Sequence, residues 1–160
     1  IATEAALTGH LLFSTLHTND APQTVTRLLE MGVEPFLISA TLVGVCAQRL
    51  VRRLCRCKIK YEPPPEEMHL LSAHGSIEFL FKPRGCGICR NSGYKGRIGI
   101  HELMTLTDTL KQAINERAPA LEIKRISMEE GMKTLHHDAS AKVVEGVTSL
   151  DEMIRAVQED

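Results

Sequence analysis

Four of the five cysteines stand in two close pairs, and no other feature of the sequence constrains the fold as strongly. The first pair is Cys55 and Cys57, the second is Cys86 and Cys89, and a proline-rich turn at residues 63–65 lies between them. Two such pairs can bring four thiolates onto one tetrahedral zinc ion. Because four thiolates leave no position for water, the predicted role of the metal is structural.

The two pairs differ in spacing. Cys86 and Cys89 have the two intervening residues that are usual in a zinc knuckle, and glycines such as Gly93 permit the tight turns around them. Cys55 and Cys57 have one intervening residue, which makes that knuckle harder to close. The alternatives are a disulfide or four unconnected thiols. Nothing in the sequence indicates a secretory signal, so a disulfide is disfavoured.

Length and composition limit the number of domains and the kinds of partner that the chain can have. The 160 residues allow one domain or one and a half, and with only 4% aromatic residues the core depends on Leu, Ile, Val and Met. A net charge of −1 implies no general attraction to polyanions, and no apolar run is long enough to span a bilayer. The sequence starts at Ile1, inside a helical pattern and without an initiator Met, so we expect a fragment of a longer chain.

An apolar run at residues 10–16 is typical of a buried parallel strand. It follows a helix predicted over residues 2–8 and ends in a polar cluster that begins with His17 and Thr18. Open α/β sheets bind ligands at the carboxyl ends of their strands. The same cluster ends in Asp20, which can cap the next helix.

The rest of the chain alternates short helical and extended patterns with turn residues. The predicted helices are 21–31, 35–48, 66–73, 107–116, 121–132, 134–145 and 150 to the end, and the predicted strands are 49–54, 78–82 and 98–104. As an alternative, the helix that begins at Pro35 continues to Arg53. Cys46 lies in that helix and is expected to pack as a small core residue.

His17 is the sharpest candidate for chemistry, because an imidazole at a strand end can donate to a phosphate oxygen or orient a water. From its position alone, a histidine that caps the loop through hydrogen bonds is the simpler interpretation. His10 begins the same predicted strand at its other end and need not share that site. No phosphate-binding P-loop, dinucleotide fingerprint or nucleophile elbow occurs in the sequence.

A basic run of six Lys and Arg residues at 49–60 surrounds the first cysteine pair. It can bind nucleic acid, contact an acidic face or a nucleotide in a neighbouring subunit, or offset the two net negative charges of a tetrathiolate zinc. Nucleic acid is disfavoured and is not predicted as a partner, because no aromatic residues for base stacking are interspersed and no known module is present.

Residues 7–21, Leu-Thr-Gly-His-Leu-Leu-Phe-Ser-Thr-Leu-His-Thr-Asn-Asp-Ala, resemble the histidine box of the secretion and pilus-assembly ATPases. The resemblance continues over nearly the whole chain, through residues 27–28, 31–36, 47–50, 93–102 and 131–135. The tetracysteine element is similar to that of the type II secretion ATPases and the type IV pilus extension ATPases, whereas the retraction ATPases lack it. In those relatives the first pair usually has two intervening residues.

The resemblance implies an α/β fold. Residues 1–54 would be the C-terminal part of a RecA-like ATPase core, 55–97 a tetracysteine zinc-binding element, and 98–160 a C-terminal strand and helical region. It also implies a homo-hexameric cytoplasmic motor that docks peripherally on an inner-membrane platform protein and drives secretion or pilus polymerisation. The alternative from another class is a stand-alone zinc-stabilised interaction module without catalysis.

The resemblance also implies the site residues. In that family the P-loop, the aspartate box and the Walker B glutamate precede the histidine box, so ATP and Mg²⁺ belong to the full-length parent. The fragment alone is therefore expected to be inactive. His17 and His10 correspond to the two box histidines and are expected to be catalytic, with His17 and Thr18 near the nucleotide.

Overall fold

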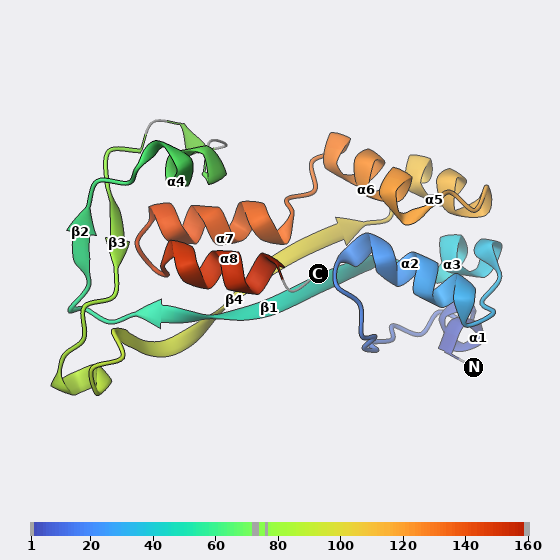
Figure 1. The fold of residues 1–160 in the computed structure, drawn as a ribbon. Helices are drawn as coiled ribbons and strands as arrows, with labels where there is room; N and C mark the ends of the chain where they lie inside the picture. Colours follow the sequence, from blue (N-terminus) through green and yellow to red (C-terminus); the bar gives the residue numbers. More distant parts are fainter. Residues whose placement is uncertain (1, 72–73, 76, 159–160) are drawn as a thin grey trace. The chain divides into compact units, whose positions relative to one another are not determined.

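A computed structural model describes residues 2–71, 74–75 and 77–158 (Figure 1). The chain divides into two compact units, each formed by two separate stretches of the sequence. The first unit comprises Ile1–Ala47 and Glu102–Lys133, and the second comprises Gln48–His101 and Thr134–Asp160. The described helices include none long and apolar enough to cross a membrane.

The first unit is mainly helical. Its helices are α1 (Ala2–Leu7), α2 (Ala21–Glu30), α3 (Pro35–Thr41), α5 (Asp108–Asn115) and α6 (Ala120–Glu129). The apolar faces of α2, α3, α5 and α6 meet in one core that a methionine of the strand Tyr94–Thr105 completes, formed by Ala21, Val25, Ile38, Met104, Leu110, Ile114 and Ile123. Two long strands begin or end in this unit, β1 (Gly44–Leu54) and β4 (Tyr94–Thr105), and they pair. Beside them, the N–H of Leu106 donates to the carbonyl of Val43 at 3.1 Å.

The second unit contains the remaining elements. They are β2 (Ile59–Tyr61), α4 (Pro65–Leu70), β3 (Leu80–Lys82), a 3₁₀ turn (Gly87–Cys89), α7 (Leu135–Val144) and α8 (Leu150–Gln158). Strands β2 and β3 pair antiparallel, with Lys60 opposite Phe81. Helices α7 and α8 pack side by side, and α7 also contacts β3 (Figure 1). The N–H of Leu54 donates to the carbonyl of Val147 at 2.8 Å, which ties the end of β1 to the turn before α8.

The predicted helices with a recognisable N-cap are confirmed. Asp20 caps α2 by accepting from the N–H of Gln23, and Thr107 and Thr134 cap α5 and α7 in the same way. Such side chains satisfy amide donors that the first turn of a helix leaves unpaired. The predicted helix at 66–73 is found as α4, and residues 72–73 lie outside the described part of the chain.

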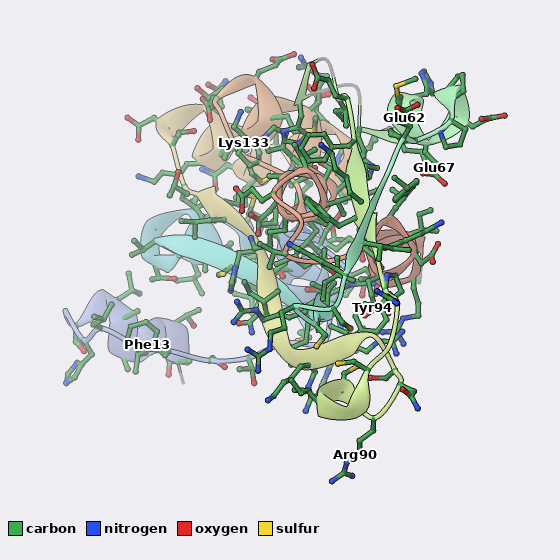
Figure 2. All side chains as sticks on the ribbon, turned by 90° about the vertical axis from the view of Figure 1, so that its left-hand side faces the viewer. Phe13, Glu62, Glu67, Arg90, Tyr94 and Lys133 are labelled. Atoms are coloured by element: carbon green, nitrogen blue, oxygen red, sulfur yellow. The ribbon has the colours of Figure 1, made fainter. Side chains whose placement is uncertain are left out.

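The strand predicted at residues 10–16 is wrong for this chain. The segment is extended without strand pairing, and its apolar side chains face solvent, with Leu11 75% and Phe13 91% exposed (Figure 2). A buried parallel strand needs a strand on each side and helices over both faces. Within the described residues no segment supplies such neighbours to residues 10–16.

The helix predicted at 35–48 is also wrong beyond Thr41, as is its extension to Arg53. Strand β1 begins at Gly44, five residues before the predicted strand start. β-branched residues such as Val43 and Val45 favour extended backbone. Gly44 also lets the strands approach closely, since a Cβ there would lie 3.1 Å from the carbonyl oxygen of Met104. Cys46 therefore lies exposed on a strand and does not pack in a core.

Candidate metal centre and histidine segment

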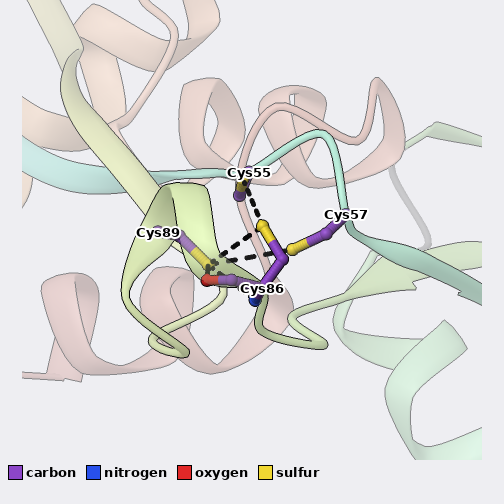
Figure 3. Close-up of side chains that lie close together, drawn as sticks. All are labelled: Cys55, Cys57, Cys86 and Cys89. Atoms are coloured by element: carbon purple, nitrogen blue, oxygen red, sulfur yellow. Dashed lines mark hydrogen bonds between the residues drawn. The ribbon is translucent and has the colours of Figure 1, made fainter.

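The four paired cysteines converge in the second unit (Figure 3). Their sulfur atoms all lie within 4.8 Å of one another, and three of the separations are 3.9 Å (Cys55 to Cys86), 3.8 Å (Cys57 to Cys89) and 3.7 Å (Cys86 to Cys89). Zinc–thiolate bonds of about 2.3 Å in a tetrahedron require sulfur atoms about 3.8 Å apart. The sulfur positions therefore fit one tetrahedral zinc ion.

A tight turn closes the short first pair. The N–H of Cys55 donates to the carbonyl of Gly93 at 2.9 Å, and the N–H of Lys58 donates back to the carbonyl of Cys55 at 2.9 Å. This turn folds the chain back on itself after β1, so Cys57 reaches the same site as Cys55. One intervening residue is thus enough here, although the sequence indicated that this knuckle is hard to close.

The second pair lies on the 3₁₀ turn. The amide groups of Cys86 and Gly93 donate to the sulfur of Cys89, at 3.1 and 3.2 Å. Gly93 has a φ of +77°, and a Cβ there would approach the Cβ of Pro83 to 2.3 Å. Only glycine fits this position without displacement of the chain. The predicted Gly-rich turns therefore aim backbone donors at a thiolate.

The thiols have unequal acidities. Burial by itself would raise the pKa of Cys89, but the two amide donors and the neighbouring sulfurs of Cys86 and Cys57 bring it down to about 6. The pKa of Cys86 is also lowered, chiefly by the N–H of Cys89. Burial raises the pKa of Cys57 to about 11. The second knuckle therefore favours thiolates, the form that binds metal.

The histidine segment lies in the first unit and has a different character. His17 is exposed, and Thr18 is half-buried with its hydroxyl 2.9 Å from that of Thr24. His10 is exposed, and its Nδ1 lies 3.2 Å from the carbonyl of Ala5 at the end of α1. Among the described residues, no hydrogen bond or ion pair joins His10 to His17. The structure thus places His17 and Thr18 directly before α2, and His10 directly after α1.

One carboxylate beside this segment was missed by the sequence interpretation. Glu102 is only 1% exposed, and its Oε1 accepts a hydrogen bond of 2.9 Å from the N–H of Ala21, the first residue of α2. Next to it, Lys124 pairs with Asp20 at 2.9 Å. Both contacts fix the N-terminus of α2, which the histidine segment enters. The available signal was the alternation in β4, which puts Glu102 on the same face as buried Ile100 and Met104.

Known proteins match this chain closely. Type IV pilus assembly ATPase PilB of Thermus thermophilus is 52% identical over an alignment of 158 positions that covers 96% of this chain and 18% of that protein. Type II secretion system protein E of Pseudomonas aeruginosa is 43% identical over an alignment of 162 positions that covers 100% of this chain and 32% of that protein. The chain thus spans only a minor part of the relatives it matches.

A solved structure supports the fold. The crystal structure of the pilus retraction motor PilT with bound ADP matches with a TM-score of 0.63 at 20% identity, over 97% of this chain and 34% of that one. At this identity the match establishes the α/β fold alone. The family described as "Type II/IV secretion system protein" matches residues 1–155. The chain therefore belongs to the type II/IV secretion system protein family.

Proposed function

We propose that this chain is the C-terminal part of a hexameric motor ATPase that uses ATP binding and hydrolysis to drive type II secretion or type IV pilus polymerisation. The family match over residues 1–155 carries this proposal, and the names of relatives such as PilB support it. The motor acts in the cytoplasm on an inner-membrane platform protein. Residues 1–54 complete its RecA-like core.

Within the motor, residues 55–97 hold one structural zinc ion on Cys55, Cys57, Cys86 and Cys89. The near-tetrahedral sulfur positions support this assignment. Bound zinc would supply no open coordination position, so it stabilises the fold and does not activate water. Residues 98–160 form the C-terminal strand and helical region.

His17 and Thr18 contact the nucleotide in the parent enzyme, and His10 belongs to the same catalytic box. The exposure of both histidines is compatible with contacts to groups outside the described residues. ATP and Mg²⁺ are held by a P-loop and a Walker B carboxylate elsewhere in the parent. Residues 1–160 alone contain neither motif and are inactive.

The test is ATP hydrolysis by the full-length protein and by residues 1–160, with zinc measured by elemental analysis of protein kept reduced. We expect Mg²⁺-dependent turnover by the former only, and one zinc per chain in both. If the full-length protein binds zinc but neither binds nor hydrolyses ATP, it is instead a zinc-stabilised interaction module. Protein-dependent turnover by residues 1–160 would contradict the assignment of the P-loop to another part of the protein.

A further inference from the structure

The basic residues of this chain are concentrated around the cysteines. Two segments, 49–60 and 82–97, hold eleven of the 19 Lys and Arg residues and contain no Asp or Glu. The first segment contributes Arg49, Arg52, Arg53, Arg56, Lys58 and Lys60, and the second contributes Lys82, Arg84, Arg90, Lys95 and Arg97. Each segment carries one cysteine pair, so most of the positive charge of the chain lies close in sequence to the four cysteines.

Five of these cations have partners within the second unit. Arg52 pairs with the buried carboxylate of Glu152 at 2.6 Å, and Arg49 and Lys58 donate to backbone carbonyls. Lys60 and Lys82 lie over aromatic rings. These contacts support the fold and explain why five basic residues occur there.

The side chains of the other six cations are exposed, and none has a hydrogen bond, ion pair or ring contact within the described part of the chain. We call these six residues the basic collar: Arg53, Arg56, Arg84, Arg90, Lys95 and Arg97. Figure 2 shows the side chain of Arg90 projecting outward from the 3₁₀ turn. A tetrathiolate zinc carries two negative charges, so six further cations exceed what that centre requires. An exposed cluster of like charges repels itself, and it is stabilised when an anionic partner binds.

We propose that the basic collar docks an acidic polypeptide segment of a partner protein. Five of its six members are arginines, whose planar guanidinium groups match carboxylates in bidentate geometry. The zinc site and the glycine turns hold their backbone in place, which lowers the entropy lost on binding. This inference does not depend on ATP hydrolysis by the parent.

Two other anionic partners fit the collar less well. Single-stranded nucleic acid needs exposed aromatic rings for stacking, but Lys58, Lys60 and Lys82 already cover the rings of Phe81, Phe79 and Tyr61. Membrane-surface binding usually uses an amphipathic helix with an apolar face. The collar lies on strands and turns, and the exposed large apolar side chains described in segments 49–60 and 82–97 are Leu50, Ile59 and Ile88, none of them on an amphipathic helix.

The first unit of a second copy of this chain is also a poor partner. Its exposed carboxylates are largely neutralised by cations of the same unit: Glu30 by Arg27, Glu34 by Arg117, Asp108 by Lys111, and Glu122 and Glu129 by Arg125. Docking on the collar would require breaking those pairs.

The test uses the full-length protein and a fluorescein-labelled 16-residue peptide with Glu at alternate positions, read by fluorescence anisotropy. The triple variant Arg56→Gln, Arg84→Gln and Arg90→Gln should bind this peptide about tenfold more weakly than the unchanged protein. The control is Arg27→Gln, Arg117→Gln and Arg125→Gln, which removes the same charge from the first unit. It should change the affinity less than about twofold.

Zinc content and thermal unfolding verify that both variants are folded. If the triple variant loses zinc, Arg90→Gln alone still tests the proposal, with an expected loss of about two- to threefold. Equal losses in the two triple variants would overturn the proposal. The proposal would also be overturned if the collar substitutions weakened binding to phosphatidylglycerol vesicles or to a 16-nucleotide single strand but left binding to the peptide unchanged. A change of oligomeric state in the collar variant alone would identify a second copy as the occupant and overturn it too.

Discussion

The cysteine element and the histidine segment are built on opposite principles. Around the quartet, each sulfur lies close to other sulfurs, and amide donors from within the element point at Cys89. In the histidine segment, Leu11 and Phe13 face solvent and His17 has no described partner. The first region can therefore hold its shape from its own residues and a metal. The second leaves Leu11, Phe13 and His17 exposed and gives them no described contact that would hold their side chains in place.

Loss of the metal should cause the largest drop in stability, and this drop should be confined to the cysteine element. Cys86→Ser leaves three thiolates facing an underfilled ion, so we expect a loss of about 3–5 kcal/mol in the free energy of unfolding. Cys46→Ser, at an exposed strand position, is the matched control and should cost almost nothing. Limited proteolysis should show new cleavage within residues 55–97 in the Cys86 variant or after chelation.

Cleavage within residues 10–17 should be the same with and without zinc, because that segment is already extended and exposed. If metal-free, reduced protein shows an unchanged pattern in residues 55–97, turns and packing alone hold the quartet together.

His17→Ala in the full-length protein tests the other region. If His17 acts on charge that develops on the phosphate, turnover falls about 10²-fold while ATP binding changes little. His69→Ala, an exposed histidine of α4, serves as the control and should leave turnover unchanged. Steady-state hydrolysis and nucleotide-binding measurements separate the two effects. Normal turnover in a folded His17 variant would contradict a catalytic role for this histidine.

Substitutions at two glycines test how tightly the cysteine element is packed. Gly93 and Gly96 both have positive φ, +77° and +79°, but an added Cβ clashes with Pro83 only at Gly93. We expect Gly96→Ala to cost about 1 kcal/mol from backbone strain, and Gly93→Ala to cost more, about 2–4 kcal/mol. Chemical denaturation of the zinc-loaded protein gives both values. Equal costs would mean that the turn around Pro83 relaxes easily.

A smaller effect on stability should come from the buried carboxylate of Glu152, and it should depend on pH. Burial would raise the pKa of Glu152, but the side chain and N–H of Arg52, with Arg155, lower it below the usual 4.5. A folded pKa below the unfolded one stabilises the protein fully above about pH 4.5 and loses that stabilisation as pH falls through the folded pKa. Glu152→Gln should therefore be less stable than the unchanged protein at pH 7, by about 1–3 kcal/mol.

This difference should shrink below about pH 4.5, as shown by denaturation at several pH values. Glu30→Gln, from an exposed pair with Arg27, should change stability by less than about 0.5 kcal/mol at pH 7. A pH-independent difference for Glu152→Gln would indicate that packing, and not charge, accounts for its contribution.

Features that depend on residues close together in the sequence could be predicted, whereas features that depend on distant residues could not. The caps Asp20, Thr107 and Thr134 act on amides three residues away, and the helices that they begin were predicted correctly. The strand at 10–16 failed because burial depends on neighbouring strands and helices, which the described residues do not supply. The helix at 35–48 failed because a continuous apolar run is ambiguous between helix and strand.

The same distinction applies to the candidate sites. The cysteine quartet was predicted because two close cysteine pairs, one of them with the usual two intervening residues, signal a metal site, and the structure brings all four sulfurs together. Glu102 was missed because its partner, the N–H of Ala21, lies 81 positions away in the chain. The roles of His10, His17 and Thr18 stay predictions, because the described residues contain no nucleotide and no P-loop against which they could be tested.

The order of the segments has a consequence for folding kinetics. The first unit is discontinuous, since residues 48–101 separate its two parts, and the Ala21–Glu102 contact must close a loop of 81 positions. The sulfur contacts inside that loop close only 31 and 32 positions. Loop closure loses more chain entropy as the loop lengthens, so the cysteine contacts are the easier to form first. Once formed, they shorten the effective loop. Metal capture early in folding would then accelerate assembly of a helical core that contains none of the metal ligands.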